Sequence, residues 1–146
     1  MRISRKAEYA LRALLAMARQ PRCCSIQELS VRENIPVKFL EQILLSLRHA
    51  GLLTSKRGVG GGYTLLKAAG DVTIAEVLRV FDGPLALVAC AIDRPLERCT
   101  CPDPRTCPLR HTMTELHREL TTLFESRTLE DMLRAAPDAG ALAFEI

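Results

Sequence analysis

Apolar residues recur every three or four positions in three stretches of the first half of the chain, a spacing that predicts amphipathic helices. These stretches cover about 4–19, 25–33 and 36–50, and Gly51 is a natural cap for the end of the third. A short helix, a tight turn and a longer helix in this order are typical of a helix-turn-helix. The longer helix carries a predicted buried stripe of Phe39, Leu40, Ile43, Leu44 and Leu47.

An extended pattern follows the third helix. Two short strands are predicted at about 52–55 and 63–66, and the connection between them is rich in glycine and begins with Lys56 and Arg57. This arrangement is a β-hairpin with a basic tip. The hairpin adds a wing to the helix-turn-helix, so the first half of the chain predicts a winged helix-turn-helix.

The second half of the chain is predicted to be helical around one irregular segment. Helices are expected at about 73–81, 108–126 and 129–135, whereas residues 88–108 are interrupted by prolines. The long helix has a heptad seam, which suits a partner helix in a homodimer. An ordinary helix that packs on its own domain is the alternative. The seam consists of Leu109, Met113, Leu116, Leu120 and Leu123.

These elements predict a mainly α fold with a small β-hairpin wing and a long C-terminal dimerisation helix. We expect a winged helix-turn-helix DNA-binding domain at 1–83 and a cysteine-rich sensor loop at 84–107. The dimerisation helix and a short docking helix would occupy 108–135, and a loose tail would occupy 136–146.

The 146 residues carry a net charge of +3, but the charge is unevenly distributed. Residues 1–67 have a charge of +8 and the remainder has a charge of −5. A basic first half favours an anionic partner for that half, with a solvated helical surface as the plainer alternative. We expect double-stranded DNA as the partner. The charged N-terminus and the short apolar runs predict a cytoplasmic protein with no membrane partner.

The predicted DNA contacts lie mainly on the third helix and on the wing. The N-terminal residues of a recognition helix lie near base edges in the major groove. Lys38 suits guanine or phosphate, Gln42 suits adenine, and Glu41 can accept from cytosine. Arg57 at the wing tip suits phosphates or a narrow minor groove. The other expected contacts are Arg2, Ser4, Ser25, Gly60, Gly61 and Tyr63.

The glycine-rich wing could instead be a nucleotide-binding loop. However, Tyr63 stands where Gly-x-Gly-x-x-Gly needs its third glycine, and a strand rather than a helix follows. No set of side chains typical of an enzyme is evident. We therefore predict neither an enzyme nor a small-molecule substrate.

Four of the six cysteines lie within one stretch of 18 residues, inside the irregular segment. Thiolates favour iron–sulfur clusters, zinc or copper(I), and the lack of paired Cys-x-x-Cys spacing makes zinc less favoured. A metal-free redox switch and inert core thiols remain open. Cys23 and Cys24 lie apart and are interpreted as structural or incidental. The predicted metal ligands are Cys90, Cys99, Cys101 and Cys107.

Three segments resemble the Rrf2 family of bacterial regulators: Met1 to Ala10, Phe39 to Ile43, and Arg57 to Tyr63. The resemblance covers about residues 1–133. It implies a homodimer joined by the long helix, recognition of a pseudo-palindromic operator by the third helix, and minor-groove contact around Arg57. It also implies a 2Fe–2S or 4Fe–4S cluster held by three cysteines ahead of the long helix.

The cysteine spacing matches the family pattern in part. Cys101 and Cys107 fit the last two ligands, and Cys90 is the expected first ligand with Cys99 as a competitor. Glu8 and His111 are candidates for the fourth position. The implied function is a DNA-binding regulator, expected to be a repressor, whose cluster responds to a redox, iron or nitric-oxide signal. The alternatives are a cluster-free thiol or sulfur-metabolism regulator, and a small metal or redox carrier with no DNA role.

Overall fold

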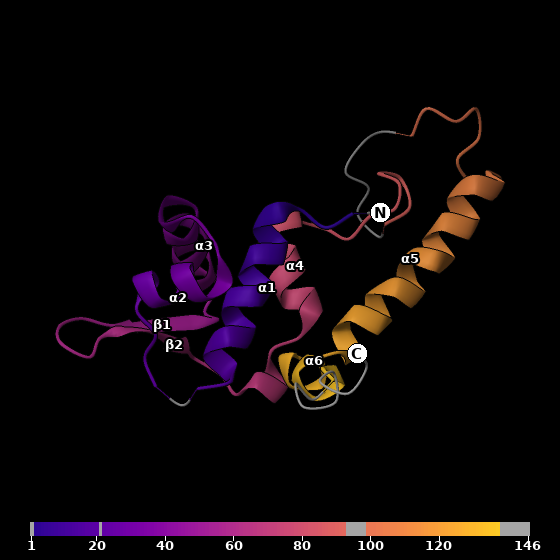
Figure 1. The fold of residues 1–146 in the computed structure, drawn as a ribbon. Helices are drawn as coiled ribbons and strands as arrows, with labels where there is room; N and C mark the ends of the chain where they lie inside the picture. The colour runs from indigo at the N-terminus through magenta and orange to yellow at the C-terminus, as the bar shows by residue number, and fades with distance from the viewer. Residues whose placement is uncertain (1, 21, 93–98, 138–146) are drawn as a thin grey trace, which may run out of the picture.

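The structure, a computed structural model, describes residues 2–20, 22–92 and 99–137. The predicted tail therefore lies mostly outside the described residues. Each predicted helix and strand is present and ends within one residue of its predicted bounds, and a short 3-10 turn, η1, is added after the wing (Figure 1). The elements are α1 (Arg5–Ala18), α2 (Ile26–Glu33), α3 (Val37–His49), β1 (Leu53–Lys56), β2 (Gly62–Leu65), η1 (Ala69–Asp71), α4 (Ile74–Asp82), α5 (Pro108–Ser126) and α6 (Leu129–Ala135).

Side-chain caps fix where four of the helices begin. Ser4 and Ser25 each accept a hydrogen bond from the backbone N–H three residues later, at the starts of α1 and α2. Thr73 and Thr128 form reciprocal capping boxes at α4 and α6. Asn34 adopts the left-handed conformation that ends α2 and makes the tight turn into α3. These local hydrogen bonds and the turn at Asn34 therefore fix where the helices of the helix-turn-helix begin and end.

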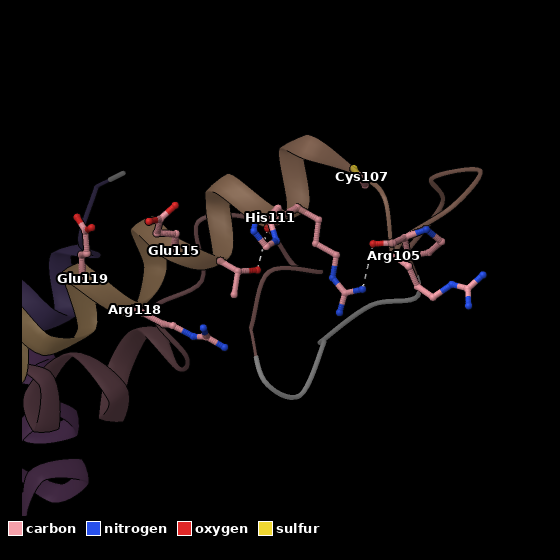
Figure 2. Close-up of a pocket in the computed structure, with 9 residues that line it drawn as sticks. Arg105, Cys107, His111, Glu115, Arg118 and Glu119 are labelled. Atoms are coloured by element: carbon pink, nitrogen blue, oxygen red, sulfur yellow. Dashed lines mark hydrogen bonds between the residues drawn. The ribbon is translucent and has the colours of Figure 1, made fainter.

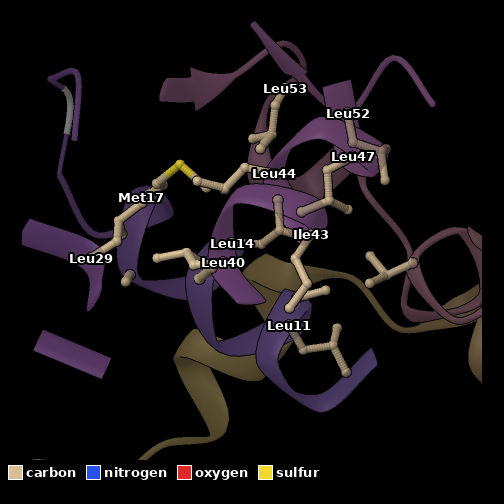
Figure 3. Close-up of a cluster of buried hydrophobic side chains, with 14 of the residues drawn as sticks. Leu11, Leu14, Met17, Leu29, Leu40, Ile43, Leu44, Leu47, Leu52 and Leu53 are labelled. Carbon is tan, nitrogen blue, oxygen red and sulfur yellow. The ribbon is translucent and has the colours of Figure 1, made fainter. Parts of the chain in front are cut away.

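The core lies where α1 crosses α3 and α4 and contacts α2, α6 and the wing. Ala7, Ala10 and Ala13 of α1 are fully buried, and their small side chains let neighbouring helices approach closely. No buried polar or charged side chain occurs among the described residues. Figure 3 shows the leucine-rich cluster that α1 shares with α2, α3 and the wing: Leu11, Leu14, Met17, Leu29, Leu40, Ile43, Leu44, Leu47, Leu52 and Leu53.

The prediction that Phe39 belongs to the buried stripe of α3 is wrong. Its side chain is 41% exposed, whereas Leu40, Ile43 and the other two stripe residues are buried. The reason is geometric, because Phe39 lies at the edge of the stripe, about 90° around the helix from the middle of the four buried residues. The ring of Phe39 instead meets Tyr9 of α1 edge to face, with 6.1 Å between the ring centroids.

The long helix α5 extends from the cysteine loop toward α6 and has no buried residue. The predicted heptad seam is divided between two environments. Leu109, Leu116 and Leu123, seven residues apart, are exposed, whereas Met113 and Leu120 are half-buried. One side of α5 thus packs near its own domain, on α4, whereas one leucine row is largely exposed to solvent.

The short helix α6 anchors the end of α5 to the winged body. The backbone N–H of Leu129 donates to the carbonyl of Val72, and that of Ile74 donates to the carbonyl of Arg127. Leu129 is fully buried in the main core. Among the described residues, no helix combines the length and the apolar character that crossing a membrane requires.

The α1 core predicts a clear stability difference between two substitutions. Leu14→Ala removes a fully buried side chain and should lower the free energy of unfolding by about 2–5 kcal/mol. Val31→Ala, at a position that is 84% exposed, should change it by no more than about 0.5 kcal/mol. Urea denaturation followed by circular dichroism measures both. Equal effects of the two substitutions would contradict this description of the core.

Candidate nucleic-acid interface and cysteine loop

The outward face of α3 carries three exposed polar side chains near its start. Lys38, Glu41 and Gln42 are exposed on the side of the helix opposite its buried leucines. Within the described part of the chain, neither Lys38 nor Glu41 forms an ion pair with another side chain. These groups are therefore free to meet an external partner, and they lie in the first two turns of the helix that follows the tight turn.

The wing presents its basic tip on a tightly closed turn. Lys56 pairs with Gly62 at the end of the antiparallel ladder, and Arg57 is exposed beyond it. The backbone N–H of Gly61 donates to the carbonyl of Gly58 across the tip, at 3.0 Å. A Cβ atom at Gly61 would lie only 2.3 Å from the carbonyl oxygen of Lys56. The tip conformation therefore requires glycine at this position.

A two-bond bridge joins the base of the wing to the start of α2. The backbones of Cys24 and Tyr63 exchange hydrogen bonds of 3.0 and 2.8 Å. At Gly62, a Cβ atom would lie 2.3 Å from the carbonyl oxygen of Cys24, so the two chains are in direct backbone contact. Cys24 itself is fully buried, and burial raises the pKa of its thiol. These contacts give Cys24 a structural role, in agreement with one of the two sequence interpretations.

The other predicted contacts lie around the helix starts. Arg2 is exposed, next to Ser4. The hydroxyl oxygens of Ser4 and Ser25 accept backbone hydrogen bonds as helix caps. A hydroxyl still has one O–H to donate, so capping leaves both serines able to bind a phosphate.

The structure places two cysteines of the loop in contact with each other. The sulfur atoms of Cys101 and Cys107 are 3.5 Å apart. Cys99 interacts with both Cys101 and Cys90: the backbone and then the thiol of Cys101, followed by the thiol of Cys90, hold the pKa of Cys99 below its usual value. The set of four cysteine ligands stays a prediction.

The two close thiols differ in their tendency to ionise. The backbone N–H of Arg110, at the start of α5, is the main cause that lowers the pKa of Cys107, and Cys101 adds to it. Hydrogen bonds to Cys107 and then Cys99 are the main causes that raise the pKa of Cys101 to about 12. Cys107 is therefore the more readily ionised member of this pair, because the first turn of a helix stabilises a thiolate.

The spacing of this thiol pair suits a common metal ion. Two thiolates on one tetrahedral ion, each about 2.3 Å from it, lie about 3.8 Å apart, close to the separation of Cys101 and Cys107. Among the described residues, no group of three or more histidine, cysteine or acidic side chains is arranged to hold a metal ion. The described loop thus provides one close thiol pair rather than a closed metal site.

The candidates for a fourth ligand lie in different surroundings. Glu8 forms ion pairs with Arg5 and Arg12 on α1, at 3.1 and 3.8 Å. His111 is exposed on the first turns of α5 and borders the same groove as Cys107. In the single chain His111 is therefore the candidate that shares a surface with the thiols.

This groove lies along the first half of α5 and encloses about 530 Å³ (Figure 2). Arg110, which sequence reasoning did not single out as a structural residue, holds the loop against the helix. Its guanidinium donates to the carbonyls of Cys90 and Pro104, at 3.1 and 3.4 Å. The groove is lined by Pro104, Arg105, Cys107, Arg110, His111, Thr114, Glu115, Arg118 and Glu119.

The contrast between loop and core thiols predicts their reactivity. Mild oxidation with diamide, which takes two electrons and two protons from a thiol pair, should join Cys101 to Cys107. Alkylation of Cys24 in the folded protein should be about a thousandfold slower than alkylation of Cys107, because Cys24 reacts only after unfolding. Peptide mass spectrometry measures both. Rapid labelling of Cys24, or no Cys101–Cys107 link, would contradict the geometry, and Cys107→Ser is the control for the link.

Comparisons with known proteins agree with this architecture. A family profile described as Rrf2, iron-dependent transcriptional regulator, matches residues 3–135. An rrf2-like HTH-type transcriptional regulator of Rhodobacter capsulatus is 42% identical over 96% of this chain and 97% of its own length. The HTH-type transcriptional regulator IscR of Xenorhabdus nematophila is 32% identical over 92% of this chain and 80% of its own length.

Solved structures show the same fold. CymR, the global cysteine regulator of B. subtilis, matches 94% of this chain and 99% of its own with a TM-score of 0.77 at 27% identity. T. potens IscR matches 95% of this chain and 90% of its own with a TM-score of 0.73 at 26% identity. These proteins are regulators. They therefore argue against the alternative prediction of a small metal or redox carrier without a DNA role. The chain is therefore a member of the Rrf2 family, a DNA-binding helix-turn-helix transcriptional regulator and not an enzyme.

Proposed function

We propose that two copies of this chain bind one pseudo-palindromic operator as a repressor, and that the cysteine loop controls this binding. The observation that carries the proposal is that the polar residues of α3, the basic wing and the close thiol pair occur in one chain, ahead of the long helix α5. The DNA-reading part corresponds to residues 1–83 and the sensing part to residues 84–107. Residues 108–135 join the two copies.

The recognition helix α3 would enter the major groove, where Lys38, Glu41 and Gln42 meet base edges. The wing would follow the adjacent backbone, with Arg57 on phosphate or in the minor groove. The remaining contacts would position the protein rather than read sequence, because they suit phosphate oxygens. They are Arg2, Ser4, Ser25, Gly60, Gly61 and Tyr63.

The exposed leucine row of α5 supports the proposal that a second copy of the chain packs against this helix. Leu109, Leu116 and Leu123 recur at the heptad interval, which directs side chains to one side of a helix pair. With 19 residues, α5 is about 28 Å long, so the row extends along most of the helix. Two recognition helices related by such a dimer axis would face two half-sites of one operator.

The cysteine loop supports an iron–sulfur cluster as the sensing group. Cys101 and Cys107 would be two ligands, Cys90 or Cys99 would be the third, and Glu8 or His111 is a candidate for the fourth. A cluster, when bound, supplies a centre that is sensitive to redox state, iron supply and nitric oxide. The family description, which reads iron-dependent, and the similarity to IscR favour this group.

Two hydrogen bonds lie on either side of the point where the DNA-reading half of the chain passes into the loop. His117 Nδ1 of α5 lies 2.8 Å from the carbonyl oxygen of Leu85, just after α4. Asp82, at the end of α4, accepts a 3.0 Å hydrogen bond from the backbone N–H of Ser4. A change in the loop would therefore act on α5 and on the start of α1, and would alter how the two reading heads match their half-sites.

Salt dependence of binding tests the DNA part of the proposal. With an operator selected from random DNA, the affinity should fall steeply as salt rises, because each phosphate contact releases counterions. Arg57→Ala should weaken binding and reduce the slope of log affinity against log salt by about 1. Arg134→Ala, on α6, should leave the slope unchanged. Fluorescence anisotropy measures each slope. An affinity that does not depend on salt would refute DNA binding through these residues.

Anaerobic reconstitution with iron and sulfide tests the sensing part. The wild-type chain should develop a visible absorption band that disappears with an iron chelator. Cys107→Ser should lose at least half of the iron bound per chain, whereas Cys23→Ser should bind as much as the wild type. The absence of an iron-dependent band in the wild type would refute the proposed iron–sulfur cluster.

A cluster-free thiol switch is the second candidate. The 3.5 Å approach of Cys101 and Cys107 favours it, because a thiol pair this close can form a disulfide after a small movement. The fold also matches that of a cysteine regulator, CymR. The redox response of DNA affinity in chelator-treated protein distinguishes this candidate from the cluster.

A further inference from the structure

Leu45 is an apolar side chain at the centre of the outward face of α3. It is 45% exposed, whereas Leu44, the preceding residue, is fully buried. Each residue turns a helix by about 100°, which places Lys38, Leu45 and His49 within about 30° of the direction opposite the buried leucines. Leu45 therefore points the same way as the polar groups that would read DNA.

The position of Leu45 completes a regular set. Lys38, Glu41, Gln42 and Leu45 follow the spacing 0, 3, 4 and 7, the same spacing that base-reading residues have on the recognition helix of homeodomains. Seven residues advance about 10 Å along the helix axis. At 3.4 Å per base-pair step, Leu45 would lie about three base pairs beyond the pair nearest Lys38.

The surroundings of Leu45 favour a base edge over a protein partner. Protein-binding patches have several contiguous apolar side chains, but the exposed face around Leu45 consists of polar residues. Phe39, the other large exposed side chain in the middle of α3, contacts Tyr9 instead. A single leucine flanked by hydrogen-bonding side chains is complementary to a DNA major groove that presents one apolar group among hydrogen-bond donors and acceptors.

Thymine is the base that presents such a group, because its C5-methyl projects into the major groove. We propose that Leu45 packs against the methyl group of one thymine in each half-site and so determines specificity at that base pair. The inference rests on the proposed binding of α3 in the major groove. Leucine has no donor or acceptor, so discrimination at this position depends on the methyl group alone.

Replacing thymine with deoxyuridine tests this role, because the replacement removes only the methyl group. An operator is first selected from random DNA with the full chain, and each thymine is then replaced in turn. At one thymine per half-site, the replacement should weaken wild-type binding about fourfold, which corresponds to one buried methyl group. Leu45→Ala should bind the thymine and deoxyuridine operators equally well.

Two controls separate this effect from a general loss of binding. Val31→Ala, on the exposed side of α2, should keep the wild-type preference for thymine. The salt slope of Leu45→Ala should equal that of the wild type, because leucine contacts no phosphate charge.

The inference is overturned if wild-type affinity is unchanged by deoxyuridine at every thymine, or if Leu45→Ala keeps the deoxyuridine penalty. Either result, combined with steep salt dependence, would leave the proposed DNA binding intact. Failure of the wild-type chain to enrich any DNA would instead refute the proposed function itself.

Discussion

The packing of α1 against α3 and α4 is the constraint on which the rest of the structure depends. The alanines of α1 bring the other helices close, and its leucines fill the space between them. Since α3 presents its buried stripe to this core, its opposite face must point to solvent. The orientation of the recognition helix is thus a consequence of hydrophobic burial, and the polar residues on it are free to serve binding.

The second half of the chain is organised by hydrogen bonds rather than by burial. Arg110 holds the two ends of the described cysteine loop, and His117 holds the segment after α4. At the far end of α5, backbone bonds around Thr73 and Thr128 return the chain to the core. A segment held by a few partly buried hydrogen bonds opens more readily than a packed core, which is a suitable property for a sensing loop.

The helices and strands could be predicted because capping residues, prolines and apolar periods act locally. The wrong prediction that Phe39 is buried shows the limit of a periodic pattern. An apolar residue at the edge of a helical stripe has the same sequence spacing whether it is buried or exposed. The bridge between Cys24 and Tyr63 joins residues about forty positions apart through backbone atoms, so no pattern of side chains in the sequence predicts it. Similarly, the sequence predicted that four cysteines are near one another, but the clamp by Arg110 depends on the path of the loop.

The Cys24–Tyr63 bridge has a consequence for how regulation can work. Because the base of the wing is fastened to the start of α2 by backbone bonds and close contact at Gly62, movement of this base is coupled to the helix-turn-helix. In the proposed dimer, each head would therefore read a half-site of constant length and register. A signal that reaches the heads of this proposed dimer would change the distance and angle between the two copies, so evolution of new targets through this scaffold is expected to vary the spacer between half-sites separately from their sequence.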